Sequence, residues 1–214
     1  MLDPGRSFVR RGPQSAGKVN KQLLLLRHAR HAAAENHTFI GSTDIELSEE
    51  GRRQAASMDA FLQPYHPERC FCSPLKRCIE TIRTFAGLQV EISPDLREID
   101  FGNWEGKTFD QIQEMDPEAV NQWSCFDPEF SFPGGERVSD FLVRIDHVAT
   151  ALASCPEKTI LVVTHAGIIR ALICHFLGLS PRQYLLFNIQ FGSLAILELF
   201  GDKGVLAGLN CFPR

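Results

Sequence analysis

The chain has 214 residues and a formal net charge of −4, and 44% of its residues are hydrophobic while 22% are charged. These values are those of one ordinary globular domain with a buried core. The slightly acidic balance gives no reason to expect a nucleic-acid partner, and no stretch approaches the length of a membrane span. Seven cysteines are scattered without a pair of CxxC motifs. This usage predicts free thiols in a reducing compartment and therefore a cytoplasmic protein.

Residues 1–21 form a basic stretch with five Lys or Arg residues and one acidic residue, Asp3. The stretch has scattered Gly and Pro and lacks apolar periodicity, which predicts a flexible N-terminal extension. The leucine run that follows is too short for a signal peptide and leads directly into charged residues. We therefore expect one domain over residues 22–214, with a lid-like insertion around 100–134.

The hydrophobic pattern alternates between strands and helices along the chain. In the first half of the chain it predicts a strand at Leu23–Leu26, a helix capped by Ser48, a strand at Arg69–Cys72, a helix capped by Ser73 and a strand at Val90–Ile92. In the second half it predicts a short helix capped by Thr108, a long helix containing Val138 to Leu152, a strand at Thr159–Val163 and a helix at Ile168–Leu177. A hairpin of Ala195–Phe200 and Val205–Leu209 is predicted to close the fold. Four consecutive leucines are typical of a central strand that is buried on both faces. The alternation predicts a three-layer α/β sandwich with a mainly parallel central sheet.

Two of the apolar strands end at a histidine. Arg27 and His28 follow the first strand, and His165 follows the later one. Because the carboxyl ends of parallel strands meet at one edge, where ligands bind, we expect both imidazoles there. The helix that follows the strand at Arg69–Cys72 brings Arg77 to the same edge. Two guanidinium groups and two imidazoles around one point favour a tetrahedral dianion, because an Arg fork binds two phosphoryl oxygens at once.

Four motifs in this order resemble the histidine phosphatase superfamily, the phosphoglycerate mutase-like group. They read R-H at 27–28, S-P-L-K-R-C-I-E-T at 73–81, L-R-E-I-D-F-G-N-W-E-G at 96–106 and T-H-A-G at 164–167. The resemblance runs from about residue 22 to the C-terminus. It implies a phosphoglycerate mutase-like fold and a reaction through a phosphohistidine, with no metal and no other cofactor.

The resemblance also implies a role for each matching residue. His28 is expected to be the nucleophile that accepts the phosphoryl group. Glu98 is expected to be the general acid that protonates the leaving oxygen and then activates water. Arg27, Arg77 and His165 are expected to hold the phosphoryl oxygens and to balance the charge that develops on them.

The first motif departs from the pattern of the family. Family members often read R-H-G-E-T where this chain reads R-H-A-R-H at 27–31. Arg30 and His31 therefore add positive charge where the family often has Glu-Thr. A family asparagine that helps to bind phosphate aligns without gaps with Ala34, and Asn36 replaces it if the loop is shifted.

Further candidates come from neighbouring positions. Ser42 and Thr43 lie in a stretch that resembles a family segment near the substrate, and Ala166 follows the second histidine. We expect all three to contact substrate. The remaining loop histidines are interpreted as solvated residues rather than metal ligands: His31, His37 and His66.

Together these features predict a metal-independent phosphomonoesterase that acts on a small phosphorylated metabolite. The stretch P-G-G-E at 133–136 resembles small bacterial-type phosphatases, including those that act on α-ribazole phosphate, although fructose-bisphosphate and broad-specificity phosphatases resemble the chain nearly as well. The compact segment before the later strand favours hydrolysis over mutase-type phosphoryl transfer. That transferase, and a catalytically weak phosphate-binding protein on the same fold, are the alternatives. The expected partner is the small substrate, and the sequence leaves open whether the chain forms a homodimer.

Overall fold

The computed structural model of the protein describes residues 20–83, 85, 87–201 and 203–213. The expected N-terminal extension, residues 1–21, lies almost wholly outside the described residues. Its last residue, Lys21, opens the first strand, β1 (Lys21–Arg27). The buried Lys21 Nζ donates to the carbonyl oxygen of Leu152 at 2.6 Å, near the carboxyl end of helix α5 (Val138–Ser154), where the helix dipole favours a cation.

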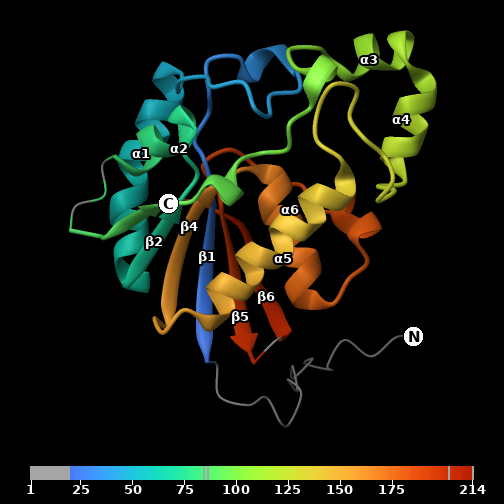
Figure 1. Cartoon of the computed structure of the whole chain (residues 1–214). Coiled ribbons are helices and arrows are strands. Elements are labelled where there is room, and N and C mark those ends of the chain that lie inside the picture. Colours follow the sequence, from blue (N-terminus) through green and yellow to red (C-terminus); the bar gives the residue numbers. More distant parts are fainter. Residues whose placement is uncertain (1–19, 84, 86, 202, 214) are drawn as a thin grey trace, which may run out of the picture.

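One mixed sheet forms the centre of the molecule (Figure 1). Its other strands are β2 (Arg69–Cys72), β3 (Val90–Ile92), β4 (Thr159–Thr164), β5 (Leu194–Phe200) and β6 (Lys203–Cys211). Among the described residues the sheet has six strands in the order β3-β2-β4-β1-β5-β6. The pairs β3–β2, β2–β4 and β4–β1 are parallel, whereas β5 is antiparallel to both of its neighbours. The prediction of a mainly parallel sheet is therefore confirmed.

Helices cover both faces of this sheet. The others are α1 (Glu49–Leu62), α2 (Lys76–Ile82), α3 (Phe109–Met115), α4 (Pro117–Ser124) and α6 (Ala166–Leu177). Helices α1 and α2 lie on one face and α5 and α6 on the other, while α3 and α4 lie beyond the upper edge of the sheet (Figure 1). Helix α4 was not predicted from the sequence. The sequence does contain a start signal for this helix, which is Asp116 followed by Pro117. In the structure Asp116 is the N-cap and accepts from the N–H of Ala119 at 3.0 Å, and Pro117 occupies the first helical position.

The four leucines of β1 divide between two hydrophobic cores. Leu23 and Leu25 pack in the core that contains the buried faces of α5 and α6. Leu24 and Leu26 pack in the core formed with α1 and α2. Side chains alternate between the two faces of a strand, and both faces of β1 are covered, so every position in the run is apolar. The three-layer α/β fold is confirmed.

Ser73 does not cap α2, contrary to the sequence prediction. The helix begins at Lys76, and the N-cap position is held by Leu75 in an extended conformation. The Ser73 hydroxyl Oγ lies 2.8 Å from His165 Nε2 instead. The N–H of Lys76 donates to Asp44 Oδ1 at 2.7 Å, so a carboxylate from a distant loop satisfies the start of the helix. A local pattern contains no information about either of these tertiary partners.

The cysteines are all free thiols, as the sequence predicts, and several of them lie in the hydrophobic core. Across the described parts of the chain, no helix combines the length with the hydropathy that crossing a membrane requires.

We expect Leu25→Ala to lower the free energy of unfolding by about 2–5 kcal/mol, because it leaves a cavity in the centre of the sheet. Leu25 is fully buried, whereas Leu186 is 74% exposed. The matched control Leu186→Ala should therefore change that free energy by less than about 0.5 kcal/mol. Denaturant unfolding followed by circular dichroism measures both values, and equal losses would contradict the packing of β1.

Candidate active site

The two strand-terminal histidines meet at the carboxyl edge of the sheet. Strands β1 and β4 pair in parallel with Arg27 opposite Thr164. His28 and His165 therefore leave the sheet at the same level, and their ring centroids lie 5.1 Å apart. Both imidazoles are buried. The parallel pairing thus brings together two residues that are far apart in the sequence.

His28 has one ring nitrogen available for chemistry. Its Nδ1 lies 2.8 Å from the carbonyl oxygen of Ala29. Because a carbonyl oxygen only accepts, Nδ1 donates and the proton-free nitrogen is Nε2. Burial, followed by the charges of Arg77, His165 and Arg27, lowers the pKa of His28 well below its usual value. His28 is therefore a neutral imidazole with a free lone pair at neutral pH, which is the nucleophilic form.

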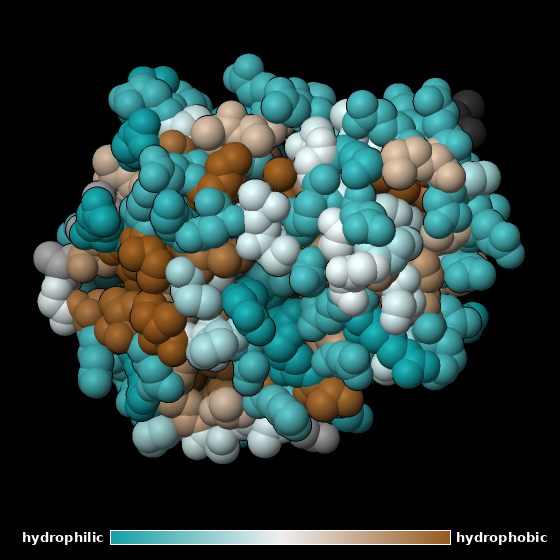
Figure 2. Space-filling view, turned by 45° about the horizontal axis from the view of Figure 1, so that its top comes forward, coloured by the Kyte–Doolittle hydropathy of each residue, from teal (hydrophilic) through white to brown (hydrophobic). Residues whose placement is uncertain are grey.

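A cavity of about 330 Å³ opens beside His28. Its ionisable lining residues, apart from His28 and one tyrosine, are Arg27, His31, His37, Glu98 and Arg170. Glu98 is the only carboxylate that lines this cavity among the residues that the structure describes. The surface around this end of the molecule is mainly hydrophilic, with smaller hydrophobic patches (Figure 2). Guanidinium and imidazole groups thus outnumber carboxylates, which suits an anionic ligand.

Arg27 presents an unpaired donor in this cavity. Its Nη1 donates to the carbonyl oxygen of Ile189 at 2.6 Å, and its Cζ lies 3.6 Å from the centroid of the Phe191 ring. Its Nε is buried without a hydrogen-bond partner. Burial lowers the pKa of Arg27 to about 9, which leaves the group positively charged at neutral pH. A buried cation with an unsatisfied N–H is the kind of group that an oxyanion satisfies.

Arg77 and His165 are fully buried, and neither lines the cavity. Arg77 Nε donates to His165 Nδ1 at 3.2 Å, and its Nη1 and Nη2 donate to the carbonyl oxygens of Thr43 at 2.8 Å and Gly41 at 2.7 Å. A guanidinium has five N–H groups, so two remain beyond these three bonds. Since His165 Nδ1 accepts, its Nε2 carries the proton that is donated to Ser73 Oγ. Burial and then the neighbouring guanidinium groups lower the pKa of His165 well below its usual value, so this imidazole is also neutral.

Glu98 lies between the cavity and the start of α6. Its Oε1 accepts from the N–H of Ile99 at 3.1 Å, and its Oε2 accepts from the N–H of Gly167 at 3.0 Å. A Cβ added to Gly167 would lie 2.2 Å from Glu98 Oε1. The last position of the T-H-A-G motif therefore needs glycine so that this carboxylate fits against the helix.

The loop that departs from the family pattern forms part of the cavity wall. Ala34 lines the cavity, whereas the candidate Asn36 is exposed and does not. Ala166 lines it from the first turn of α6. The change from Gly to Ala29 causes no strain, because Ala29 is not among the residues with a positive φ.

Ser42 and Thr43 are held by acidic side chains outside this cavity. Glu105 Oε1 accepts from the N–H groups of Gly41 at 3.0 Å and Ser42 at 2.8 Å, and its Oε2 accepts from Thr43 Oγ1 at 2.6 Å. Ser42 lines a neighbouring cavity of about 380 Å³. Through these bonds, Glu105 fixes the loop whose carbonyl groups receive the Arg77 guanidinium.

His31 is not the solvated loop residue that the sequence analysis expected. It is 6% exposed and lines the cavity, with its ring centroid 5.7 Å from that of His28. The expectation was wrong because the His31 backbone pairs with Leu47 in an isolated antiparallel bridge, which ties the loop against the buried part of the molecule. His37 and His66 are exposed, as expected. Within the described ranges, no group of three or more His, Cys, Asp or Glu side chains is placed to hold a metal ion.

Arg170 is a cavity residue that the sequence analysis missed. Its Nε donates to the carbonyl oxygen of Phe187 at 2.7 Å. Arg170 follows Ala166 by four residues on α6, so the two share one face of the helix and both line the cavity. The four-residue spacing from Ala166 was therefore a signal in the sequence that placed Arg170 at the same site.

Residues 23–211 match the model of the Histidine phosphatase superfamily (branch 1). The chain belongs to this superfamily. The family that its four sequence motifs resemble is thereby confirmed.

The chain is also similar in sequence to individual proteins. The chain is 31% identical over 210 residues to a bifunctional protein of Mycobacterium tuberculosis (strain ATCC 25618 / H37Rv), in a match that covers 94% of this chain and 57% of that protein. It therefore spans little more than half of that relative. It is 27% identical over 194 residues to the adenosylcobalamin/alpha-ribazole phosphatase of Escherichia coli (strain K12), with 88% of this chain and 95% of that one covered.

A solved structure with the same fold is mycobacterial glucosyl-3-phosphoglycerate phosphatase in complex with VO3. It superposes with a TM-score of 0.78 at 30% identity and covers 89% of this chain and 99% of its own. The phosphoglycerate mutase-like fold that the motifs imply is confirmed.

We expect Glu105→Gln to lower the free energy of unfolding by about 1–3 kcal/mol, because both carboxylate oxygens face donors and the new amide N–H₂ group opposes one set of them. Amide hydrogen exchange at Gly41 and Ser42 should become faster in the same variant. Glu49→Gln is the matched control, since that side chain is 72% exposed and pairs only at the surface. An equal effect of the two changes on stability and exchange would contradict the anchoring role of Glu105.

Proposed function

We propose that this chain is a metal-independent phosphomonoesterase in which His28 accepts the phosphoryl group on Nε2. The observation that carries the proposal is the state of His28, a neutral imidazole whose Nδ1 is fixed by the Ala29 carbonyl and whose Nε2 is free. The imidazole borders a cationic cavity that has a single carboxylate among its described lining residues. Two relatives that are named as phosphatases support the same reaction class.

The cationic groups account for binding of the phosphoryl group. The unpaired Nε of Arg27 donates to one phosphoryl oxygen. The start of α6, where Ala166 lines the cavity, adds the partial positive charge of a helix N-terminus. Arg77 does not line the cavity, but its positive charge lies close enough to act on His28, and His165 orients that guanidinium through the bond to its Nε. These charges stabilise the transferring group most when its negative charge is greatest.

Phosphoryl transfer then proceeds in two steps. In the first, His28 Nε2 forms a bond to phosphorus while the bond between phosphorus and the ester oxygen breaks. Glu98, in its protonated form, gives its proton to the leaving oxygen. In the second, the Glu98 carboxylate takes a proton from water, whose oxygen attacks phosphorus. The N–P bond breaks, phosphate leaves, and both His28 and Glu98 return to their starting forms.

The substrate class is a small phosphorylated metabolite, with α-ribazole phosphate as the first compound to test. Aromatic rings line the cavity beside the charged groups, among them Phe39, Phe101, Tyr184 and Phe191. A cavity of this size with apolar walls and a few convergent polar groups is typical of small-molecule sites. The similarity to the Escherichia coli adenosylcobalamin/alpha-ribazole phosphatase supports this choice of compound.

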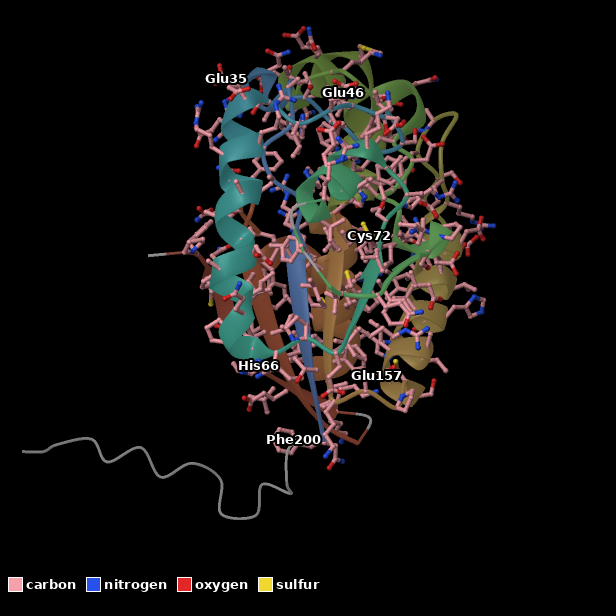
Figure 3. All side chains as sticks on the ribbon, turned by 90° about the vertical axis from the view of Figure 1, so that its left-hand side faces the viewer. Glu35, Glu46, His66, Cys72, Glu157 and Phe200 are labelled. Carbon is pink, nitrogen blue, oxygen red and sulfur yellow. The ribbon has the colours of Figure 1, made fainter. Side chains whose placement is uncertain are left out.

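We expect the wild-type chain to hydrolyse p-nitrophenyl phosphate in the presence of EDTA and His28→Ala to show only the uncatalysed rate, because the nucleophilic nitrogen is lost. The matched control is His66→Ala. His66 is exposed and lies at the opposite end of the molecule from Glu35, which follows the cavity-lining Ala34 in the chain (Figure 3). Release of p-nitrophenol measures the rate, and circular dichroism confirms folding. Turnover that survives in His28→Ala would refute the mechanism, whereas an inactive, folded wild type would favour the phosphate-binding alternative.

We expect Glu98→Gln to lower kcat/KM for an alkyl phosphate by about 10²–10⁴-fold, because the alkoxide leaves only when it is protonated. The loss for p-nitrophenyl phosphate should be smaller, since p-nitrophenolate needs little protonation to leave. The ratio kcat/KM is the correct readout because it covers the steps up to departure of the alcohol, before water is activated. Equal losses for both substrates would show that Glu98 is not the acid.

A further inference from the structure

His31 is a buried imidazole at the wall of the cavity, in a position where the family often has threonine. It is 6% exposed, and its ring lies edge-on to Phe191 with centroids 5.2 Å apart. Its centroid is 5.7 Å from that of His28, so an anion bound at His28 lies close to it. The side chain is therefore held in the site by packing.

One ring nitrogen of His31 has no protein partner. Its Nδ1 is buried and makes no hydrogen bond to any residue that the structure describes. Most buried polar side-chain atoms in proteins are paired, so an unpaired atom on a side chain that lines a cavity points to a ligand that completes it. Arg27 Nε is unpaired in the same cavity. Two orphaned nitrogens at one site are satisfied together by a group with several oxygens.

The charged and titratable groups around His31 come from several elements of the fold. They are Arg27 and His28 at the end of β1, Arg30 in its own loop, Arg77 on α2, His165 before α6, and Glu98, His37 and Arg170 in the lining of the cavity. Burial, followed by Arg77, Arg27 and Arg30, lowers the pKa of His31 to about 4. His31 is therefore neutral at physiological pH while the cavity is without an anion.

We propose that His31 is a further ligand of the phosphoryl oxygens and takes up one proton from solvent when a tetrahedral dianion binds, so that it holds the anion as an imidazolium. The proposal rests on the proposed function, because it assumes that the phosphoryl group binds beside His28. The bound dianion offsets the surrounding guanidinium charges and supplies an acceptor for the new N–H. Substrate binding is then coupled to pH through a residue that family members with threonine there do not have.

The coupling has a definite sign. Binding raises the His31 pKa above its value of about 4 in the free protein, so the complex holds more protons than the free protein between the two values. The association constant therefore falls as the pH rises through this window, by up to about tenfold per pH unit. Above the pKa of the complex, the contribution of His31 no longer depends on pH.

The test is calorimetric titration with sulfate, a tetrahedral dianion that stays unprotonated and monomeric from pH 6 to pH 8. Titrations at pH 6 in two buffers with different ionisation enthalpies give the number of protons taken up on binding. We expect wild type to take up about one-half to one proton more than His31→Gln and His31→Thr. Both variants should bind sulfate more weakly at pH 6, and the difference from wild type should shrink toward pH 8.

Two control variants separate His31 from the other ionisable groups of the cavity. His37→Gln removes an imidazole that is exposed at the same cavity, and the excess uptake should persist. Glu98→Gln removes any proton that the carboxylate takes up, and the difference between wild type and His31→Gln should persist in that background. His31→Thr restores the residue that the family often has, so it should hydrolyse p-nitrophenyl phosphate without the pH dependence of KM that is expected for wild type.

The possible outcomes separate this inference from the function on which it rests. Equal proton uptake by wild type and His31→Gln would overturn the role of His31. Weakening by the same factor at every pH would also overturn it, because that result indicates a packing role. Failure of the wild type to bind sulfate would overturn the role of His31 as an anion ligand and leave the phosphohistidine mechanism to the turnover assays, whereas survival of turnover in His28→Ala would refute only the phosphohistidine mechanism.

Discussion

The parallel pairing of β1 with β4 is the constraint on which the rest of the site depends. Its register sets Arg27 opposite Thr164, so that His28 and His165 leave the sheet together. The pairing holds because both strands are buried on both faces, between the helices of the two layers. A shift by one residue would exchange the side chains between the two cores and separate the imidazoles. The packing of leucine and valine side chains thus determines the geometry of the charged site.

The site combines many cations with histidines that are kept neutral. Burial and nearby guanidinium groups lower the pKa of His28 and of His165. The same arrangement that frees a nucleophilic nitrogen also disfavours protonation. Because these pKa values are lower in the folded state, the stability that the neutral rings contribute is lost as the pH falls below the ordinary histidine value of about 6.5. A bound anion would relieve the repulsion among the cations.

A chain of hydrogen bonds connects a surface loop with the buried guanidinium of Arg77. Glu105 accepts from the N–H groups of the loop, and the carbonyl groups of Gly41 and Thr43 in turn accept from Arg77. Arg77 then bonds to His165, which bonds to Ser73. A guanidinium buried in this way needs fixed acceptors, and the loop supplies them. Ser42 and Thr43 therefore contribute to the position of Arg77 rather than line the cavity beside His28.

The sequence by itself determined the strands, most of the helices, the layer arrangement and the family, because these follow from local periodicity, strand-end chemistry and contiguous motifs. It also determined that His28 and His165 meet, because parallel strands share a carboxyl edge. Only the tertiary structure decided the burial of His31, the pairing of Ser73 with His165 and the capping of α2 by Asp44. Each of these depends on a partner that is distant in sequence. The loops that carry such residues have no periodicity, so their positions follow from the packed fold.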